Sequence, residues 1–255
     1  MDFRDLHHGD RPLVLPNAWD FASGAALAQA GFPAIGTTSL GVAAAAGKTD
    51  ATGDTRAETL ALARSLSRLP VPVTVDIEGG FSDRVADVAE LVTELASYGI
   101  AGINLEDGRA DGTLAPLDHQ VTVIAAVKRA APQVFLNART DTFWLGDPDR
   151  DETLRRARAF AGAGADGVFV PGIVDDADIG AVLEAADVPL NVLYLPGKTG
   201  YPRLQRLGVH RISTGSLPFR KALQAAVAAA LGVTGEDGGR PAPSYGDVQR
   251  LISGR

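Results

Sequence analysis

The stretch "VPVTVDI", residues 71–77, decides the fold because its pattern, a proline followed by β-forming residues, is repeated along the chain. Similar stretches begin at Pro12, Pro132 and Pro189, so the four prolines lie 57 to 60 residues apart. Self-similarity at a nearly fixed spacing is typical of repeated supersecondary units. The sequence therefore predicts one architecture built from four successive copies of a unit.

A second kind of strand is introduced by glycine, in stretches that begin at Gly31, Gly99, Gly164 and Gly208. The proline and glycine kinds alternate, which gives eight short strands. Segments with apolar residues at helical spacing lie between them, such as "RVADVAELVTELASYG" at residues 84–99. Alternating strands and helices predict a parallel α/β sheet, and eight units in about 250 residues predict a closed (βα)8 TIM barrel.

An open, doubly wound sheet is the alternative architecture. It would usually carry a glycine-rich phosphate-binding loop after its first strand, whereas "LPNAWD" follows here at residues 15–20. Within that stretch Asp20 is expected to cap the first helix, and the spacing of Thr55 and Glu58 predicts a capping box at a later helix. The closed barrel is the better account of the sequence.

The chain is divided into a barrel domain, residues 1–231, and a tail, residues 232–255. The tail contains a linker, "VTGEDGGRPAPS" at residues 233–244, and a candidate short helix, "YGDVQRLIS" at residues 245–253. This helical tail could pack on its own barrel or against a neighbouring subunit.

Composition narrows the classes of function. The net charge of −7 is spread without a basic tract, which argues against nucleic acid as a partner. No apolar run reaches the ~18 residues of a membrane span, and the polar start "MDFRDLHHGD" lacks the apolar core of a signal peptide, so a cytoplasmic protein is expected. The absence of cysteine removes thiolate nucleophiles and cysteine metal sites.

Polar side chains follow three consecutive strands at or just past the end of each apolar run. Residues two apart on a strand share a face, and the carboxyl ends of barrel strands carry the active site. We therefore expect these side chains to form one polar ring at the barrel mouth. Its members are Asp76, Glu78, Asn104, Glu106, Asn137, Arg139 and Asp141.

Asp76, Glu78 and Glu106 place three acids on neighbouring strands. At ~5 Å and an effective dielectric constant of ~20, each like-charged pair costs roughly 3 kcal/mol. Protonation of one acid, ion pairing with Arg139, or a bound hard dication would each relieve this repulsion. Since no histidine or cysteine stands at a strand end, Mg²⁺ (or Mn²⁺ in its place) suits the oxygen ligands best.

Other titratable residues are interpreted as structural. The four histidines lie away from the strand ends, and surface or capping roles are expected for them. Asp107 precedes a glycine and is interpreted as a turn residue. The histidines are His7, His8, His119 and His210.

The motifs "PNAWD", "TTSLGVAAAAGKTD", "VTVDIEGG", "GINLEDG", "LNARTD" and "GADGVFVPG" together resemble the phosphoenolpyruvate mutase and isocitrate lyase superfamily. The resemblance runs from about Leu13 to Phe219. It implies that Asp76 binds Mg²⁺ directly, and that Glu78, Glu106 and Asp50 hold the water ligands of the ion. It also implies oligomers, dimers or tetramers, often formed by exchange of a C-terminal helix.

The resemblance also implies roles in substrate binding and catalysis. Arg139 and Asp50 would be catalytic, with Arg139 also gripping substrate oxygens. Thr38, Ser39 and Leu40 would cradle a carboxylate. The substrates of the superfamily are 2-oxo acids or compounds that yield them, and its shared intermediate is a metal-bound enolate.

Two departures from the superfamily bear on the reaction. The lyases that cleave isocitrate or methylisocitrate carry a loop cysteine, which this chain lacks, and the mutase loop motif is missing from residues 107–118. We therefore expect a Mg²⁺-dependent lyase acting on an oxaloacetate-like 2-oxo acid by C–C cleavage or decarboxylation. The alternatives are C–P mutase or hydrolase chemistry on phosphonopyruvate, and a protein that binds a 2-oxo acid without turnover.

Overall fold

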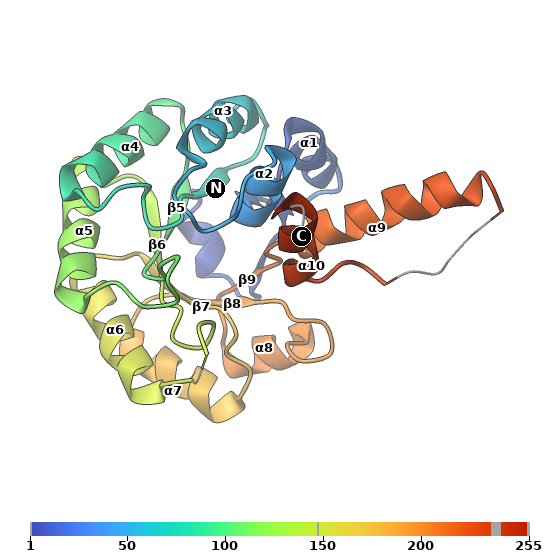
Figure 1. Ribbon diagram of the computed structural model, residues 1–255. Helices are drawn as coiled ribbons and strands as arrows, with labels where there is room; N and C mark the ends of the chain where they lie inside the picture. Colours follow the sequence, from blue (N-terminus) through green and yellow to red (C-terminus); the bar gives the residue numbers. More distant parts are fainter. Residues whose placement is uncertain (1, 147, 236–240, 254–255) are drawn as a thin grey trace.

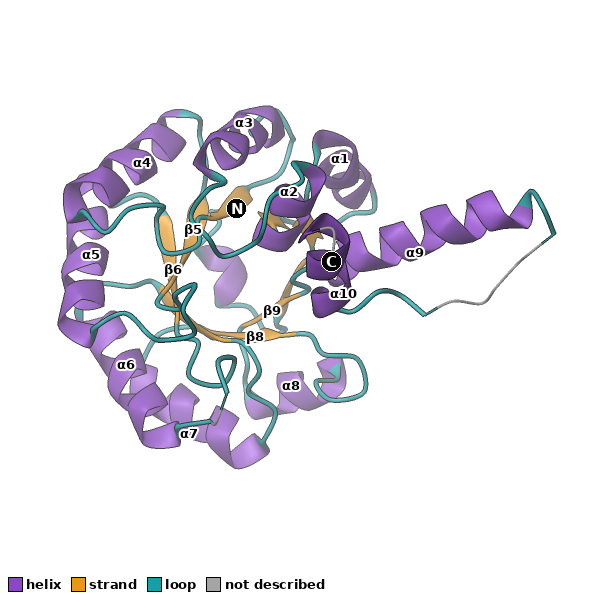
Figure 2. Ribbon diagram, viewed as in Figure 1, coloured by secondary structure: helices purple, strands orange, loops and turns teal. Residues whose placement is uncertain are grey.

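The computed structural model describes residues 2–146, 148–235 and 241–253, and it confirms the closed (βα)8 barrel with a C-terminal helix. Helices surround a parallel sheet whose strands run along the barrel wall (Figures 1 and 2). The strands are β1 Leu13–Leu15, β2 Asn17–Ala18, β3 Ile35–Thr37, β4 Val73–Asp76, β5 Gly102–Glu106, β6 Phe135–Arg139, β7 Gly167–Val170, β8 Leu190–Leu193 and β9 Arg211–Ser213.

Helices lie between most of these strands, and α2 and α3 both follow β3. They are η1 Asp5–His7, α1 Phe21–Gln29, α2 Ser39–Ala45, α3 Arg56–Leu66, α4 Val85–Ser97, α5 Leu117–Ala130, α6 Arg150–Gly162, α7 Asp176–Ala186, α8 Tyr201–Leu207, α9 Leu217–Gly232 and α10 Tyr245–Ser253.

The first predicted strand is divided in two at Pro16, and the two parts close the barrel. β1 pairs with β9, whereas β2 pairs with β3. β1 and β2 together therefore take the place of one barrel strand, and the nine described strands form an eight-stranded barrel. Pro16 has no N–H to give to a ladder, but its carbonyl accepts from the Gly36 N–H at 2.8 Å. The other strands pair in chain order, which places the ends of β4, β5 and β6 side by side.

The repeated glycines have a backbone role. Gly31, Gly99, Gly164 and Gly208 all have positive φ, between 84° and 101°. Each follows a helix and turns the chain toward the next strand, in a conformation that side chains with a Cβ rarely adopt. The glycine half of the repeat is therefore dictated by helix termination.

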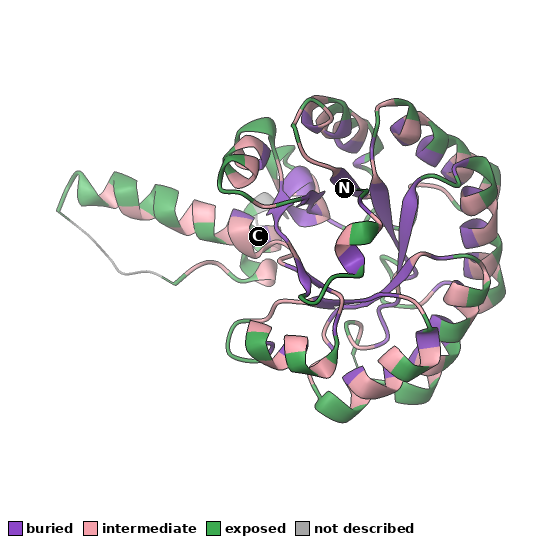
Figure 3. Cartoon of the chain, turned by 180° about the vertical axis from the view of Figure 1, so that it is seen from behind, coloured by how far each residue is buried: buried purple, intermediate pink, exposed green. Residues whose placement is uncertain are grey.

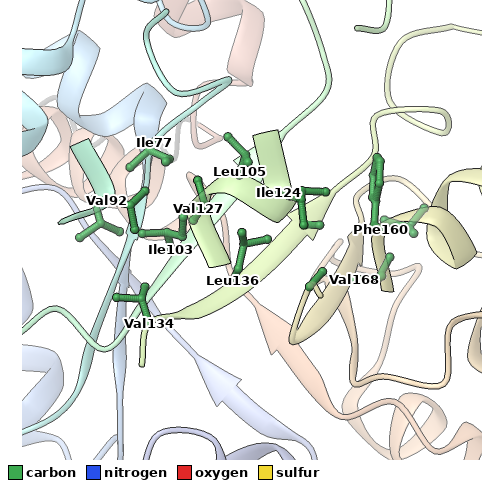
Figure 4. Close-up of a cluster of buried hydrophobic side chains, with 14 of the residues drawn as sticks. Ile77, Val92, Ile103, Leu105, Ile124, Val127, Val134, Leu136, Phe160 and Val168 are labelled. Atoms are coloured by element: carbon green, nitrogen blue, oxygen red, sulfur yellow. The ribbon is translucent and has the colours of Figure 1, made fainter. Parts of the chain in front are cut away.

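The main core lies between the barrel wall and the helices. Ile77, Ile103 and Leu136 face outward from the strand region toward Val92, Val127 and other helix residues (Figure 4). All of these side chains are buried. The helices are thereby held against the sheet, and the inward side chains are left for the barrel interior and its mouth.

The amino-terminal end of the barrel is closed by the start of the chain. The short helix η1 lies across this end when the molecule is seen from behind (Figure 3). Phe3 packs in a cluster with Leu13 and Phe135, and the His7 ring stacks on the Phe135 ring at 4.2 Å. The prediction of a surface or capping role was wrong for His7, because this aromatic cluster buries it.

The helix starts agree with one capping prediction and contradict the other. Asp20 caps α1 by accepting from the Ser23 N–H at 2.7 Å, as predicted. The capping box at Thr55 and Glu58 was wrong. The Thr55 hydroxyl does not cap α3; it donates instead to the Glu78 carboxylate.

The C-terminal segment leaves the barrel and returns to it. Helix α9 projects outward, and α10 lies back beside α2 (Figure 1). Val248 on α10 is buried with Leu40 and Phe219, so the tail packs on its own barrel. Residues 236–240 of the predicted linker lie outside the described part of the chain. Among the described residues, no helix combines the length and apolarity needed to cross a bilayer.

Candidate active site

A cavity of about 400 Å³ opens at the carboxyl ends of the strands, where the polar ring was expected. Its walls come from strand ends, from the start of α2, from the start of α9 and from the tail. The lining includes Asn17, Thr38, Ser39, Leu40, Asp50, Asp76, Asn104, Glu106, Arg139, Asp141, Trp144, Ser213, Ser216, Arg220 and Tyr245.

Asp76 and Asp50 form the acidic part of this cavity. Asp76 ends β4 and is partly exposed to the cavity, and its Oδ1 accepts from the Glu78 N–H at 3.2 Å. Asp50 is buried; its Oδ2 accepts from the Tyr245 hydroxyl at 2.6 Å, whereas Oδ1 has no partner among the described residues. Burial raises the pKa of Asp76 to about 6, although the Arg139 charge acts in the opposite direction.

Arg139 is held between two carboxylates. Its Nη1 lies 2.6 Å from Glu106 Oε2, and its Nε and Nη2 donate to the two oxygens of Asp141 at 2.6 and 3.0 Å. Burial raises the pKa of Glu106 well above its usual value, and the neighbouring Arg139 opposes that rise. The guanidinium is thus fixed at the mouth by a bidentate contact and a second ion pair.

Glu78 does not line this cavity, although it is two residues from Asp76. Its backbone has φ of 50°, so the regular strand alternation is broken before it. The carboxylate accepts from the Thr55 hydroxyl at 2.7 Å and from the Gly53 N–H at 3.0 Å. Burial raises the pKa of Glu78 to about 7.

Three of the four described non-glycine residues with positive φ, Ala51, Glu78 and Phe81, line a second hollow that adjoins this cavity, and Ala51 lines both. Each such residue costs about 1–3 kcal/mol, which surrounding structure must offset. Here the Thr55 and Gly53 contacts of Glu78 hold that residue in place. Such clustered backbone strain is typical of functional sites.

Asp107 is part of a buried ion pair rather than the turn residue that was expected. It accepts from the Asp141 N–H at 2.9 Å and pairs with Arg156 Nη1 at 2.9 Å. Asp107 and Arg156 are 1% and 5% exposed, so this pair is inaccessible to substrate. The Asp107 carboxylate fixes the Asp141 backbone and thereby helps to position the Asp141 side chain, which pairs with Arg139.

The cavity residues that the sequence analysis missed include Asn17, Arg109, Arg220 and Tyr245. Tyr245 and Arg220 come from α10 and α9, so only the folded chain brings them to the mouth. Trp144 lines the cavity, whereas Trp19 packs against Phe219. No local pattern around Tyr245 or Arg220 would have identified them.

The donor set suits a cation that keeps most of its own water. Within the described residues there is no group of three or more acids or histidines that could enclose a metal. Glu106 is paired with Arg139, and Glu78 accepts a hydrogen bond from Thr55. Asp76 and the unpartnered Oδ1 of Asp50 remain in the cavity. Mg²⁺ characteristically binds through one or two carboxylates and retains several waters, so these two residues fit it.

A parallel (βα)8 barrel with charged residues at its carboxyl mouth defines the class of TIM-barrel proteins with an enzyme-type site. Within that class, residues 3–234 match the sequence model of one protein family, which is described as phosphoenolpyruvate phosphomutase. The chain therefore belongs to the phosphoenolpyruvate mutase and isocitrate lyase superfamily.

Individual relatives cover much of the chain. An uncharacterized protein of Mycobacterium tuberculosis is 43% identical over 99% of this chain and 96% of its own length. The 2-methylisocitrate lyase of Bacillus subtilis is 30% identical over 88% and 77%, and the oxaloacetate decarboxylase of Ectopseudomonas mendocina is 31% identical over 61% and 56%.

The fold comparison agrees with these relatives. A solved structure from Burkholderia cenocepacia, provisionally assigned as a phosphonomutase, superposes with a TM-score of 0.85 at 39% identity, covering 89% of this chain and 97% of the other. The relatives with a named reaction are a lyase and a decarboxylase, and the solved structure is a provisionally assigned mutase, so the superfamily is identified but the reaction must be argued from the site.

Proposed function

We propose that this protein is a Mg²⁺-dependent lyase that acts on an oxaloacetate-like 2-oxo acid by C–C cleavage or decarboxylation. The observation that carries the proposal is the shared cavity of Asp76 and Arg139, with Arg139 held between Glu106 and Asp141. A cation site beside a fixed guanidinium matches the adjacent carboxylate and carbonyl oxygens of a 2-oxo acid. The lyases among the relatives support the same reaction class.

Different residues would bind the cation and stabilise the negative charge that develops on the substrate. Asp76, with Asp50, would hold the cation, which when bound polarises the carbonyl of the substrate as a Lewis acid. Arg139 would donate hydrogen bonds to the oxygen on which negative charge grows as the bond breaks. Glu106 and Asp141 keep the guanidinium in position, so little reorganisation is needed during the reaction.

The start of α2 would hold the other end of the 2-oxo acid group. Thr38, Ser39 and Leu40 line the cavity where β3 passes into α2. Backbone N–H groups of such a turn can bind a carboxylate. Because the chain has no cysteine, the proposed substrate is one whose cleavage does not require a thiol.

Phosphonopyruvate chemistry is the second candidate function. The similarity to the provisionally assigned phosphonomutase favours it, and the same cavity groups would bind the 2-oxo acid portion of that substrate. The two candidates differ only in whether the bond that breaks joins carbon to carbon or carbon to phosphorus.

Turnover of oxaloacetate and of phosphonopyruvate, measured side by side with Mg²⁺, tests the proposal. We expect oxaloacetate to be the better substrate, and Arg139→Lys to lower kcat/KM by about 10²–10³-fold because the bidentate donor is lost. Arg158→Lys, an exposed change on α6, is the matched control. Faster turnover of phosphonopyruvate would favour C–P chemistry, and tight binding without any turnover would favour a 2-oxo acid binder.

A further inference from the structure

A second arginine, Arg220, faces the cavity from the first turn of α9. Its Nε donates to the Ser216 hydroxyl at 3.3 Å, and its Nη1 donates to the Pro243 carbonyl at 3.1 Å. These two contacts orient the guanidinium. No partner for its Nη2 is found among the described residues, which leaves that nitrogen available to a ligand in the cavity.

Arg220 differs from Arg139 in its charge balance. Arg139 has two carboxylate partners, whereas none of the described carboxylates pairs with Arg220. Burial lowers the pKa of Arg220, because nothing nearby compensates for the lost water. An arginine remains charged in proteins, so Arg220 presents to the cavity a cation that no described carboxylate pairs with.

The position of Arg220 on its helix adds to this imbalance. The backbone at a helix N-terminus carries partial positive charge, so a basic residue there is unfavourable unless an anion faces it. Gly215 and Ser216, immediately before α9, also line the cavity. An anionic group facing Arg220 would compensate both the guanidinium charge and the partial positive charge at the start of α9.

The two arginines approach the cavity from nearly opposite sides. Arg139 ends β6, and Arg220 follows β9, which lies three strands further around the eight-stave barrel. A substrate held by Arg139 at its 2-oxo acid end would therefore direct its distal end toward Arg220.

We propose that Arg220 binds the distal carboxylate of a 4-hydroxy-2-oxo dicarboxylic acid, which favours retro-aldol cleavage over decarboxylation at this site. The inference rests on the proposed function and deepens it. A cation that binds the distal carboxylate in the ground state would oppose its loss as CO₂, since only interactions that strengthen in the transition state accelerate a reaction. In a retro-aldol cleavage that carboxylate keeps its charge throughout.

The retro-aldol step is balanced without any oxidant or reductant. The C3–C4 bond breaks and its electron pair passes to the enolate of the 2-oxo acid fragment. The C4 hydroxyl becomes an aldehyde carbonyl as its proton passes to water, and the enolate regains a proton at C3. The aldehyde fragment retains the distal carboxylate, which Arg220 holds until that fragment is released.

A matched pair of substrates isolates the distal group. With Mg²⁺ present, kcat/KM is measured for 4-hydroxy-2-oxopentanedioate and for 4-hydroxy-2-oxopentanoate, which has a methyl group in place of the distal carboxylate. We expect the unaltered protein to prefer the dicarboxylate by roughly 10- to 100-fold, the range of a hydrogen bond to a charged group. Arg220→Gln should abolish this preference, mainly through KM, and Arg220→Lys should restore part of it.

Controls separate this inference from the proposed function. Arg206→Gln, an exposed change on α8, should leave the preference unaltered. Calorimetry with oxalate, which has no distal group, reports whether the 2-oxo acid end of the site is intact in each variant. Equal turnover of the two hydroxy acids, an equal loss of both in Arg220→Gln, or turnover of oxaloacetate alone would overturn the inference while oxalate still binds. Failure of the unaltered protein to bind oxalate or turn over any 2-oxo acid would overturn the proposed function as well.

Discussion

The mouth of the barrel and its interior differ in how buried charge is compensated. At the mouth, two arginines are paired with carboxylates: Arg139 with Glu106 and Asp141, and Arg156 with Asp107. Below them Arg211, on β9, is 1% exposed, and its one hydrogen-bond partner among the described residues is the neutral Asn104 Oδ1, at 3.2 Å. The difference indicates that charges at the mouth stabilise one another, whereas Arg211 is an uncompensated cost to folding.

The interior around Arg211 holds other polar atoms without partners among the described residues. The buried atoms that lack a hydrogen-bond partner there include two guanidinium nitrogens of Arg211, both amide atoms of Asn191 and the Thr74 hydroxyl. Burial lowers the pKa of Arg211 to about 9, with the Asp76 charge acting in the opposite direction. An unpaired buried charge costs far more than a paired one.

The same substitution at two buried arginines should therefore have opposite effects on stability. Arg156→Met leaves Asp107 buried without a cation, and we expect it to lower the free energy of unfolding by about 3–5 kcal/mol. Arg211→Met removes a lone charge, and we expect a neutral or stabilising effect. Urea unfolding at pH 7 measures both. A loss in Arg211→Met as large as in Arg156→Met would contradict the contrast between the two regions.

A smaller effect should appear at the amino-terminal end, where His7 is buried against Phe135. Burial lowers the pKa of His7 to about 3, from 6.5 in an exposed histidine. Between these values the unfolded chain binds a proton that the folded chain does not, so stability falls as the pH falls below about 6.5. The His7 contribution to this slope approaches about 1.4 kcal/mol per pH unit.

Replacement of His7 isolates that contribution. Urea unfolding at pH 7 and pH 5 should show a markedly smaller acid loss in His7→Phe, which keeps an aromatic ring beside Phe135. His8→Phe, at an exposed position, should keep the full loss. If His7→Phe and the unaltered protein lost equal stability, His7 would not be buried in its neutral form.

The parts of the fold that depend on local rules could be predicted from the sequence. Prolines and glycines at fixed spacing give the barrel, because each marks the start of a strand or the end of a helix. Strand parity and barrel closure correctly place Asp76, Glu106 and Arg139 around one cavity. These features require only the alternation of side chains and the order of the strands.

The rest depends on contacts that local patterns do not contain. The positive φ of Glu78 breaks the alternation that would have placed it beside Asp76. Tyr245 and Arg220 reach the cavity because the tail packs back on α2 and α9 begins at the mouth. His7 is buried because η1 closes the amino-terminal end. Each of these is set by tertiary packing.

Calorimetric titration of oxalate, an analogue of a pyruvate enolate, tests the central claim that Asp76 holds a divalent cation which binds a 2-oxo acid together with Arg139. We expect tight binding with Mg²⁺, and loss of that binding after chelation of the metal and in Asp76→Ala. Asp10→Ala, an exposed carboxylate at the opposite end of the barrel, should bind oxalate as the unaltered protein does. Equal oxalate binding after chelation and in Asp76→Ala would show that oxalate binds without a cation held by Asp76.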